Sequence, residues 1–190
     1  MLDLTIPERS VPCVRGTLIE QALERAAALP DAPVFLGEAR PIDHAFLLGQ
    51  AESLAAGLHE QGLRSGDVIA FQLPNWFESA VVNLAACRLG LVCAPLLPFY
   101  REAELAFMLD AAGCRAVFFP AAFRGFDFGA MYQGLGPTLS CRPLLVALRG
   151  EAEGATRYED LVAAGRGRTP AWPRVKSDSV KLLLYTSGTT

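Results

Sequence analysis

Apolar and polar positions alternate along the chain with two periods, and these periods predict its elements. Two segments carry apolar side chains three or four positions apart, which predicts helices over about residues 75–89 and 102–112. Short, continuously apolar runs, typical of buried strands, precede, separate and follow them at residues 68–73, 91–95, 116–119 and 144–148. Because strands that are apolar throughout must be buried on both sides, we expect an α/β fold with a mostly parallel sheet and helices on both faces.

The region before residue 68 predicts two more helices and a short strand. Thr17 and Glu20 are spaced as a capping box, so a helix should begin there and run to about Leu29, before Pro30. Residues 34–36 predict a short strand. Apolar residues then recur at helical spacing over 47–58, and Gly62 supplies the expected stop.

The C-terminal part has a different composition. Residues 150–173 are rich in charge, glycine and proline, which predicts an exposed excursion with at most one short helix at 158–164. Residues 180–185 predict another strand. We therefore divide an incomplete N-terminal domain, residues 1–190, into an α/β subdomain at about 34–149, the excursion, and a strand that enters a polar loop at 179–190.

Composition and charge exclude several functional classes. The chain is 52% hydrophobic and 19% charged, with a net charge of −3 and no basic cluster, so nucleic acid is a poor partner. The five cysteines form no C-x-x-C pair, which favours reduced core thiols over a metal or disulfide site. His44 and His59 have no second ligand at helical spacing, so a metal site is not expected at either.

Neither an export signal nor a membrane span is expected. Residues 1–10 lack the apolar core that a secretory signal requires. The most apolar stretch, residues 79–100, is interrupted by Arg88, Gly90, Pro95 and Pro98. We expect a cytoplasmic protein.

The strongest chemical signal is the sequence Thr186, Ser187, Gly188, Thr189 and Thr190, directly after the last predicted strand. Hydroxyl and backbone N–H groups donate hydrogen bonds to phosphate oxygens, and glycine lets the backbone come close. On composition alone, an ordinary surface turn explains these residues equally well. The chain has neither a Walker A loop nor a complete G-x-G-x-x-G, which excludes these two common nucleotide-binding motifs.

A family resemblance favours the phosphate interpretation. Residues 182–190, Leu-Leu-Leu-Tyr-Thr-Ser-Gly-Thr-Thr, resemble the opening of the signature Y-T-S-G-T-T-G-x-P-K-G of the adenylate-forming superfamily. Leu-Pro-Asn-Trp-Phe-Glu at 73–78 and Ala-Pro-Leu-Leu-Pro at 94–98 are similar to upstream motifs of that superfamily, in the same order. Residues 100–105 and 123–127 are similar to AMP-forming acyl-CoA synthetases of the cyclohexanecarboxylate-CoA ligase and medium-chain types, whereas residues 42–46 depart from the usual pattern.

The resemblance implies a two-step reaction. A carboxylate attacks the α-phosphate of ATP and releases pyrophosphate, and the thiol of coenzyme A then displaces AMP from the acyl-adenylate to form a thioester. Thr186 to Thr190 would hold the β- and γ-phosphates. The implied cofactors are ATP, Mg²⁺ and coenzyme A, and no catalytic or metal-binding residue of the family pattern falls within these 190 residues.

The family signature is incomplete at Thr190, which leads to three expectations. The 190-residue chain by itself should lack synthetase activity and bind ATP very weakly. Residues 180–190 should be poorly ordered or lean on a neighbouring chain. A homodimer through the exposed edge is therefore a partner hypothesis.

Other polar and aromatic groups have simpler interpretations. Helix capping explains Asn75 and Glu78 better than catalysis does. Arg101, Glu102 and Glu104 are interpreted as a solvated helix start. The pairs at 76–77 and 118–119 are expected in the core, while residues 123–128 fit either a surface loop or an interface.

Two alternative functions remain open. The first is an aryl-acid or amino-acid adenylating enzyme that loads a carrier protein instead of coenzyme A. The second is a non-catalytic binding or assembly module with a synthetase-like sheet.

Overall fold

The computed structural model describes residues 16–36 and 41–185 and contains a five-stranded parallel sheet. Its strand order is β4-β3-β5-β8-β9, and every neighbouring pair is parallel. The strands are β3 (Val68–Phe71), β4 (Val92–Pro95), β5 (Ala116–Pro120), β8 (Leu144–Leu148) and β9 (Thr156–Arg157).

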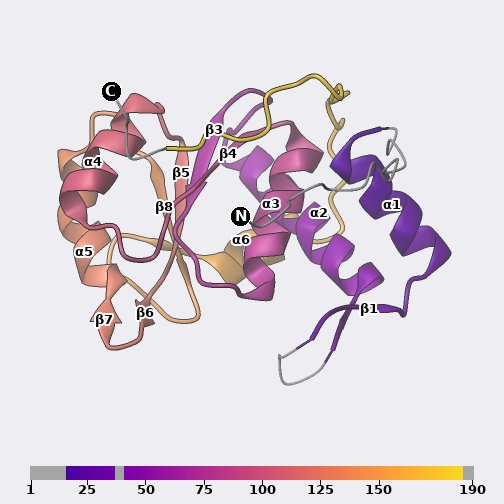
Figure 1. Cartoon of the computed structure of the whole chain (residues 1–190), viewed down its shortest axis with the longest axis horizontal. Helices are drawn as coiled ribbons and strands as arrows, with labels where there is room; N and C mark the ends of the chain where they lie inside the picture. Colours follow the sequence, from indigo (N-terminus) through magenta and orange to yellow (C-terminus); the bar gives the residue numbers. More distant parts are fainter. Residues whose placement is uncertain (1–15, 37–40, 186–190) are drawn as a thin grey trace, which may run out of the picture.

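Helices cover both faces of this sheet (Figure 1). One side holds α2 (His44–Glu60), α3 (Phe77–Leu89) and α6 (Tyr158–Gly165), with α1 (Leu18–Ala28) outside them, and the other holds α4 (Glu102–Ala111) and α5 (Phe128–Leu135), followed by the 3₁₀ turn η1 (Gly136–Thr138). Successive strand residues enter opposite cores: Phe118 packs with the first group and Phe119 with the second, and both are fully buried. The predicted α/β architecture, with helices on both faces, is confirmed.

In the described ranges, two small antiparallel strand pairs lie outside the sheet, and the second of them is a hairpin. β1 (Pro33–Phe35) pairs with β2 (Ile42–Asp43), and β6 (Ala122–Phe123) pairs with β7 (Phe126–Asp127). The β6–β7 hairpin turns at Arg124 and Gly125, whose φ angles of 50° and 78° match the left-handed geometry that tight hairpin turns require. Residues 123–128, which sequence alone left open, are therefore the tip and return strand of a hairpin and the start of α5.

Helix ends test the capping predictions. At α1 the capping box is confirmed: the Glu20 amide donates to Thr17 Oγ1 (3.3 Å) and the Thr17 amide donates to Glu20 Oε2 (2.6 Å). At α3 the prediction is wrong, because the N-cap is Trp76 and no side chain caps the helix. Asn75 is exposed, whereas Glu78 turns into the protein and is 6% exposed.

The predicted excursion at 150–173 is only partly exposed. β9 adds to the sheet beside β8, and the short predicted helix is α6, whose residues Tyr158, Leu161 and Val162 are buried in the core. Gly165 lies against α2 so closely that an added methyl group would overlap the Ser53 carbonyl oxygen. Sequence composition missed this docking because the apolar face of α6 is short.

The last described segment pairs with β4 of the same chain. Leu182 bridges Cys93 in parallel, the Cys93 amide donates to the Lys181 oxygen, and the Leu183 amide donates to the Cys93 oxygen, both at 2.8 Å. The strand predicted over 180–185 is thus reduced to one bridge. Residues 181–183 lean on β4 of their own chain, and residues 186–190, the rest of the segment predicted to be poorly ordered or to lean on a neighbouring chain, lie outside the described ranges.

Candidate functional site

The strand order places a crevice at the carboxyl ends of the sheet. The chain leaves β3 for β4 on one side, and later crosses to β5 on the other side of β3. In open α/β sheets, ligands bind where neighbouring connections diverge in this way. The segments that follow β3 and β4 and the β6–β7 hairpin enclose a pocket of about 630 Å³ here, which we call the edge pocket.

A buried polar network fixes one wall of the edge pocket. Gln72, fully buried after β3, donates from Nε2 to the carbonyl oxygens of Leu97 (2.9 Å) and Tyr100 (3.0 Å). Its Oε1 accepts a hydrogen bond of 3.0 Å from the hydroxyl of Tyr132, which is also fully buried. The loop that follows β4 is therefore tied to β3 and to α5.

The opposite wall combines phenylalanine rings with two arginines. The Arg101 guanidinium lies 4.0 Å from the centre of the Phe126 ring and donates to the Pro98 and Tyr100 carbonyl oxygens. At the predicted solvated start of α4, Glu102 and Glu104 are exposed, whereas Arg101, the N-cap, is half-buried in the wall. Arg124 is exposed at the hairpin turn, 5.3 Å from the centre of the Phe123 ring. The pocket thus offers a solvent-facing cation beside aromatic surfaces.

A half-buried ion pair lies behind this pocket. The Arg149 guanidinium donates to Glu78 Oε1 and Oε2, each at 2.8 Å, and lies 4.0 Å from the centre of the Trp76 ring. Trp76 meets Phe123 edge-on, with ring centres 5.7 Å apart. The ion pair therefore connects the end of β8 to the hairpin.

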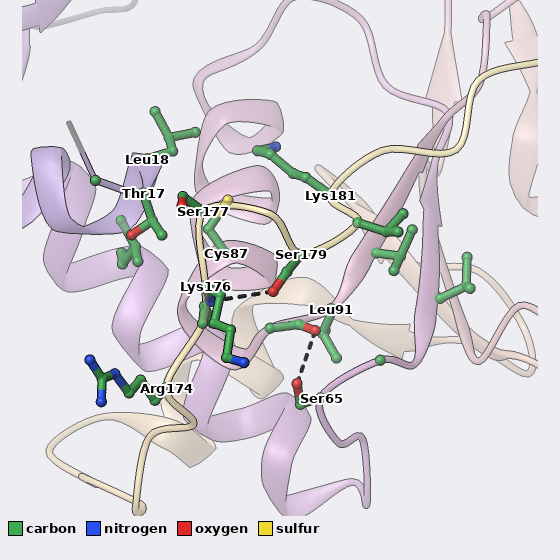
Figure 2. A pocket seen from close by; sticks show the side chains of 18 of the residues that line it. Thr17, Leu18, Ser65, Cys87, Leu91, Arg174, Lys176, Ser177, Ser179 and Lys181 are labelled. Atoms are coloured by element: carbon green, nitrogen blue, oxygen red, sulfur yellow. Dashed lines mark hydrogen bonds between the residues drawn. The ribbon is translucent and has the colours of Figure 1, made fainter. Parts of the chain in front are cut away.

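A second cavity, of about 740 Å³, lies at the amino ends of β3 and β4 beneath residues 174–183 (Figure 2). It is lined mainly by apolar groups, and Arg174, Lys176 and Lys181 are the cations at its border. Their charged ends point in different directions, and Lys181 donates to Asn83 Oδ1 at 2.6 Å. The cations do not converge on one point, so the edge pocket is the better candidate site.

Metal binding and thiol chemistry find little support in the described ranges. They contain no group of three or more histidine, cysteine, aspartate or glutamate residues placed to hold a metal ion. Burial raises the pKa of Cys87, and it raises the pKa values of Cys93 and Cys114 to about 12. These thiols stay protonated near neutral pH and are core groups, as predicted. None of the described helices is long and apolar enough to cross a membrane.

The predicted phosphate-binding residues, Thr186, Ser187, Gly188, Thr189 and Thr190, lie outside the described ranges. The structure describes the chain up to Tyr185, whose hydroxyl donates to the Met108 carbonyl oxygen at 2.6 Å. The segment that leads to the predicted phosphate-binding residues is therefore attached to β4 and α4.

The sequence profile of the family described as "AMP-binding enzyme" matches residues 23–190. The chain belongs to this family. The match covers the whole sheet and residues 186–190, in agreement with the resemblance found in the sequence.

Relatives in this AMP-binding family include two kinds of ligase. The chain is 34% identical over 151 residues to a medium-chain fatty-acid–CoA ligase of Escherichia coli K12, with 78% of the chain and 25% of the relative covered. It is 35% identical over 144 residues to a 2,3-dihydroxybenzoate-AMP ligase of Bacillus subtilis 168, with 74% and 25% covered. The chain spans about a quarter of the length of these relatives.

Two solved structures are similar to this chain in fold. Acetoacetyl-CoA synthetase from Streptomyces lividans matches with a TM-score of 0.78 and 28% identity, over 90% of this chain and 28% of that one. The anthranilate CoA ligase AuaEII, in complex with anthranoyl-AMP, matches with a TM-score of 0.80 over 90% of this chain and 32% of that one, and its 15% identity supports the fold alone.

Sequence reasoning missed most of the edge pocket, although signals were present. Gln72 stands inside an otherwise apolar run, which marks a buried amide that needs partners. Arg124-Gly125 between phenylalanines is a hairpin turn signal. The Glu78–Arg149 pair had no local signal, because its members are far apart in the sequence.

Proposed function

We propose that this chain supplies part of an AMP-forming acid–thiol ligase, which activates a carboxylic acid with ATP and transfers the acyl group to coenzyme A. The observation that carries the proposal is the match of residues 23–190 to the AMP-binding enzyme family, which includes the sequence Thr-Ser-Gly-Thr-Thr at 186–190. Similarity to acyl-CoA ligases supports coenzyme A as the acceptor.

In this proposal Thr186 to Thr190 hold the β- and γ-phosphates of ATP through hydroxyl and backbone N–H groups. The described residues contain no group of three or more histidine, cysteine, aspartate or glutamate side chains placed to hold a metal ion. We therefore assign no step of the reaction to a metal held by this part of the chain.

The edge pocket fits a ligand that joins a phosphate to a planar ring. Arg124 provides an exposed cation, and Phe99, 67% exposed, provides an aromatic surface at the same opening. Guanidinium groups pair well with phosphate, and rings stack on aromatic side chains. We propose an adenine nucleotide as the occupant, with ATP and coenzyme A as the two sources of that chemistry.

A second candidate function is an aryl-AMP ligase that loads a carrier protein. The specific observation in its favour is the 35% identity to a 2,3-dihydroxybenzoate-AMP ligase, as high as the identity to the fatty-acid–CoA ligase. Both candidates share the adenylation step and differ in the thiol that accepts the acyl group.

The natural gene product should be assayed for ATP–pyrophosphate exchange with medium-chain, alicyclic and aromatic acids, and then for thioester formation with coenzyme A. Exchange followed by coenzyme A thioester supports the first function. Exchange without that thioester supports the carrier-loading alternative, and no exchange with any acid would favour the non-catalytic module. An Arg124→Gln variant should raise KM for one nucleotide several-fold and leave the other unchanged, which identifies the occupant of the edge pocket.

A further inference from the structure

The Glu78–Arg149 ion pair is bidentate and half-buried. Glu78, the second residue of α3, is 6% exposed, and both of its carboxylate oxygens accept hydrogen bonds from one guanidinium. Such bidentate pairs fix orientation as well as charge. The carboxylate is largely buried, whereas the Arg149 side chain keeps 34% of its surface exposed, so the pair lies at the edge of the core.

The backbone at Arg149 is also unusual. Its φ angle is 54°, in the left-handed region that non-glycine residues rarely adopt because it strains the backbone. The next residue is Gly150, at φ 155°, where an added methyl group would meet the Ala121 side chain at 2.7 Å. The turn after β8 is thus held in a strained form that aims the arginine at Glu78.

The ion pair continues as a chain of contacts into the edge pocket. The Arg149 guanidinium covers the Trp76 ring at 4.0 Å, and Trp76 meets the Phe123 ring at an interplanar angle of 88°. Phe123 lines the pocket, and so does Asn75, the neighbour of Trp76. Movement of Glu78 or Arg149 would therefore displace the pocket wall.

The same molecule contains a comparable cluster away from this pocket. Arg88 pairs with Glu52 at 3.0 Å and lies 4.6 Å from the centre of the Trp172 ring. None of these three residues lines the edge pocket. A variant in this second cluster changes the same kind of arginine–glutamate–tryptophan arrangement without touching the edge pocket. Comparing variants in the two clusters therefore separates an effect on stability from an effect on the pocket.

We propose that Glu78 and Arg149 are positioning residues that hold Trp76, and through it Phe123, as a preset aromatic wall for the planar ring of the adenine nucleotide. The inference rests on the proposed function of the edge pocket. Because the aromatic wall is ordered before the nucleotide binds, no binding free energy is lost in ordering the wall. Loss of the pair acts on nucleotide affinity and leaves the chemical step unchanged.

The test uses the natural full-length enzyme. Glu78→Gln, the milder Arg149→Lys and the control Glu52→Gln are made in it for KM, kcat and melting temperature, so that Trp172 stays in the control cluster. For the spectra alone, the same variants also carry Trp172→Phe, so that Trp76 is the only tryptophan of this region. Without ligand, both pair variants should shift Trp76 emission to longer wavelength and weaken its near-ultraviolet circular dichroism. With nucleotide, KM should rise about tenfold for Glu78→Gln, and less for Arg149→Lys, while kcat stays within twofold.

The control decides between positioning and stability. Glu52→Gln should leave Trp76 emission and KM unchanged, even where it lowers the melting temperature. Unchanged emission and KM in Arg149→Lys and Glu78→Gln would overturn the proposal, as would the same KM increase in Glu52→Gln. A wild-type enzyme without pyrophosphate exchange would refute the proposed function instead, and the ligand-free Trp76 spectra would still decide whether the pair orders the wall.

Discussion

Two buried tyrosines allow a test of the polar network beneath the edge pocket. Tyr132 is fully buried and donates its hydroxyl hydrogen bond to Gln72 Oε1, whereas Tyr158 is 5% exposed and its hydroxyl has no hydrogen-bond partner among the described groups. Replacing either by phenylalanine keeps the ring and removes only the hydroxyl. The two substitutions therefore differ in what they leave behind.

Tyr132→Phe leaves the Gln72 oxygen buried without a donor, which costs about 1–3 kcal/mol of unfolding free energy. The stacked contact of the Tyr132 ring with Phe119, at 4.1 Å, remains in the variant. Tyr158→Phe removes a hydroxyl that gains nothing in the folded state, so the unfolding free energy should change by less than about 0.5 kcal/mol or rise slightly.

Urea unfolding followed by circular dichroism measures both effects. With a slope of about 2 kcal/mol per molar urea, the midpoint should fall by roughly 0.5–1.5 M for Tyr132→Phe at an unchanged slope. Adding Gln72→Leu to Tyr132→Phe should cost less than the sum of the two single changes, because the orphaned groups are partners of each other. Equal losses for the two tyrosine variants would refute the reasoning.

Three further predictions test packing, titration and capping. Gly165→Ala should destabilise the fold by about 3 kcal/mol in urea titration, because its methyl group overlaps α2 backbone, whereas Gly134→Ala, with open space at its Cβ inside α5, should stabilise it by about 0.5–1 kcal/mol. Burial raises the pKa of Cys93 from 9.0 to about 12, so between these values the unfolded chain releases a proton that the folded chain keeps, and stability falls as pH rises. Cys93→Ala should reduce that fall by about 1.4 kcal/mol per pH unit, and an unchanged slope between pH 9 and 12 would contradict the burial of the thiol. Thr17→Ala should cost about 1 kcal/mol through loss of the capping box, and thermal unfolding of Thr17→Ser, which keeps the hydroxyl, provides the control.

The sheet was predictable because its determinants are local. Runs such as 116–119 are apolar at every position, and only a strand buried between two helical layers makes full use of that pattern. Gly90 predicted the end of α3 through its freedom to adopt a positive φ, and the structure has it at 70°. The capping box of Thr17 and Glu20 was predictable because the two residues are three positions apart in the sequence.

The predictions that were wrong concern contacts between residues that lie far apart in the sequence. Glu78 was interpreted as a capping residue because its partner, Arg149, lies far away in sequence, and no local pattern connects them. The α6 helix was placed correctly but assigned to an exposed segment, since its contact with α2 depends on small residues that carry no apolar signal. The edge pocket likewise depends on a buried amide, Gln72, whose three partners come from distant segments.

The tight crossing of α2 and α6 has a consequence for biosynthesis. Both helices use a glycine at the crossing, Gly57 and Gly165, because any larger residue would overlap the opposite backbone. The ribosome releases α2 well before α6, so the nascent chain carries an uncovered α2 surface for much of its synthesis. Unfinished cores of this kind are where aggregation and chaperone binding begin. A pause in translation between the two helices would therefore lengthen the period in which this chain is most vulnerable.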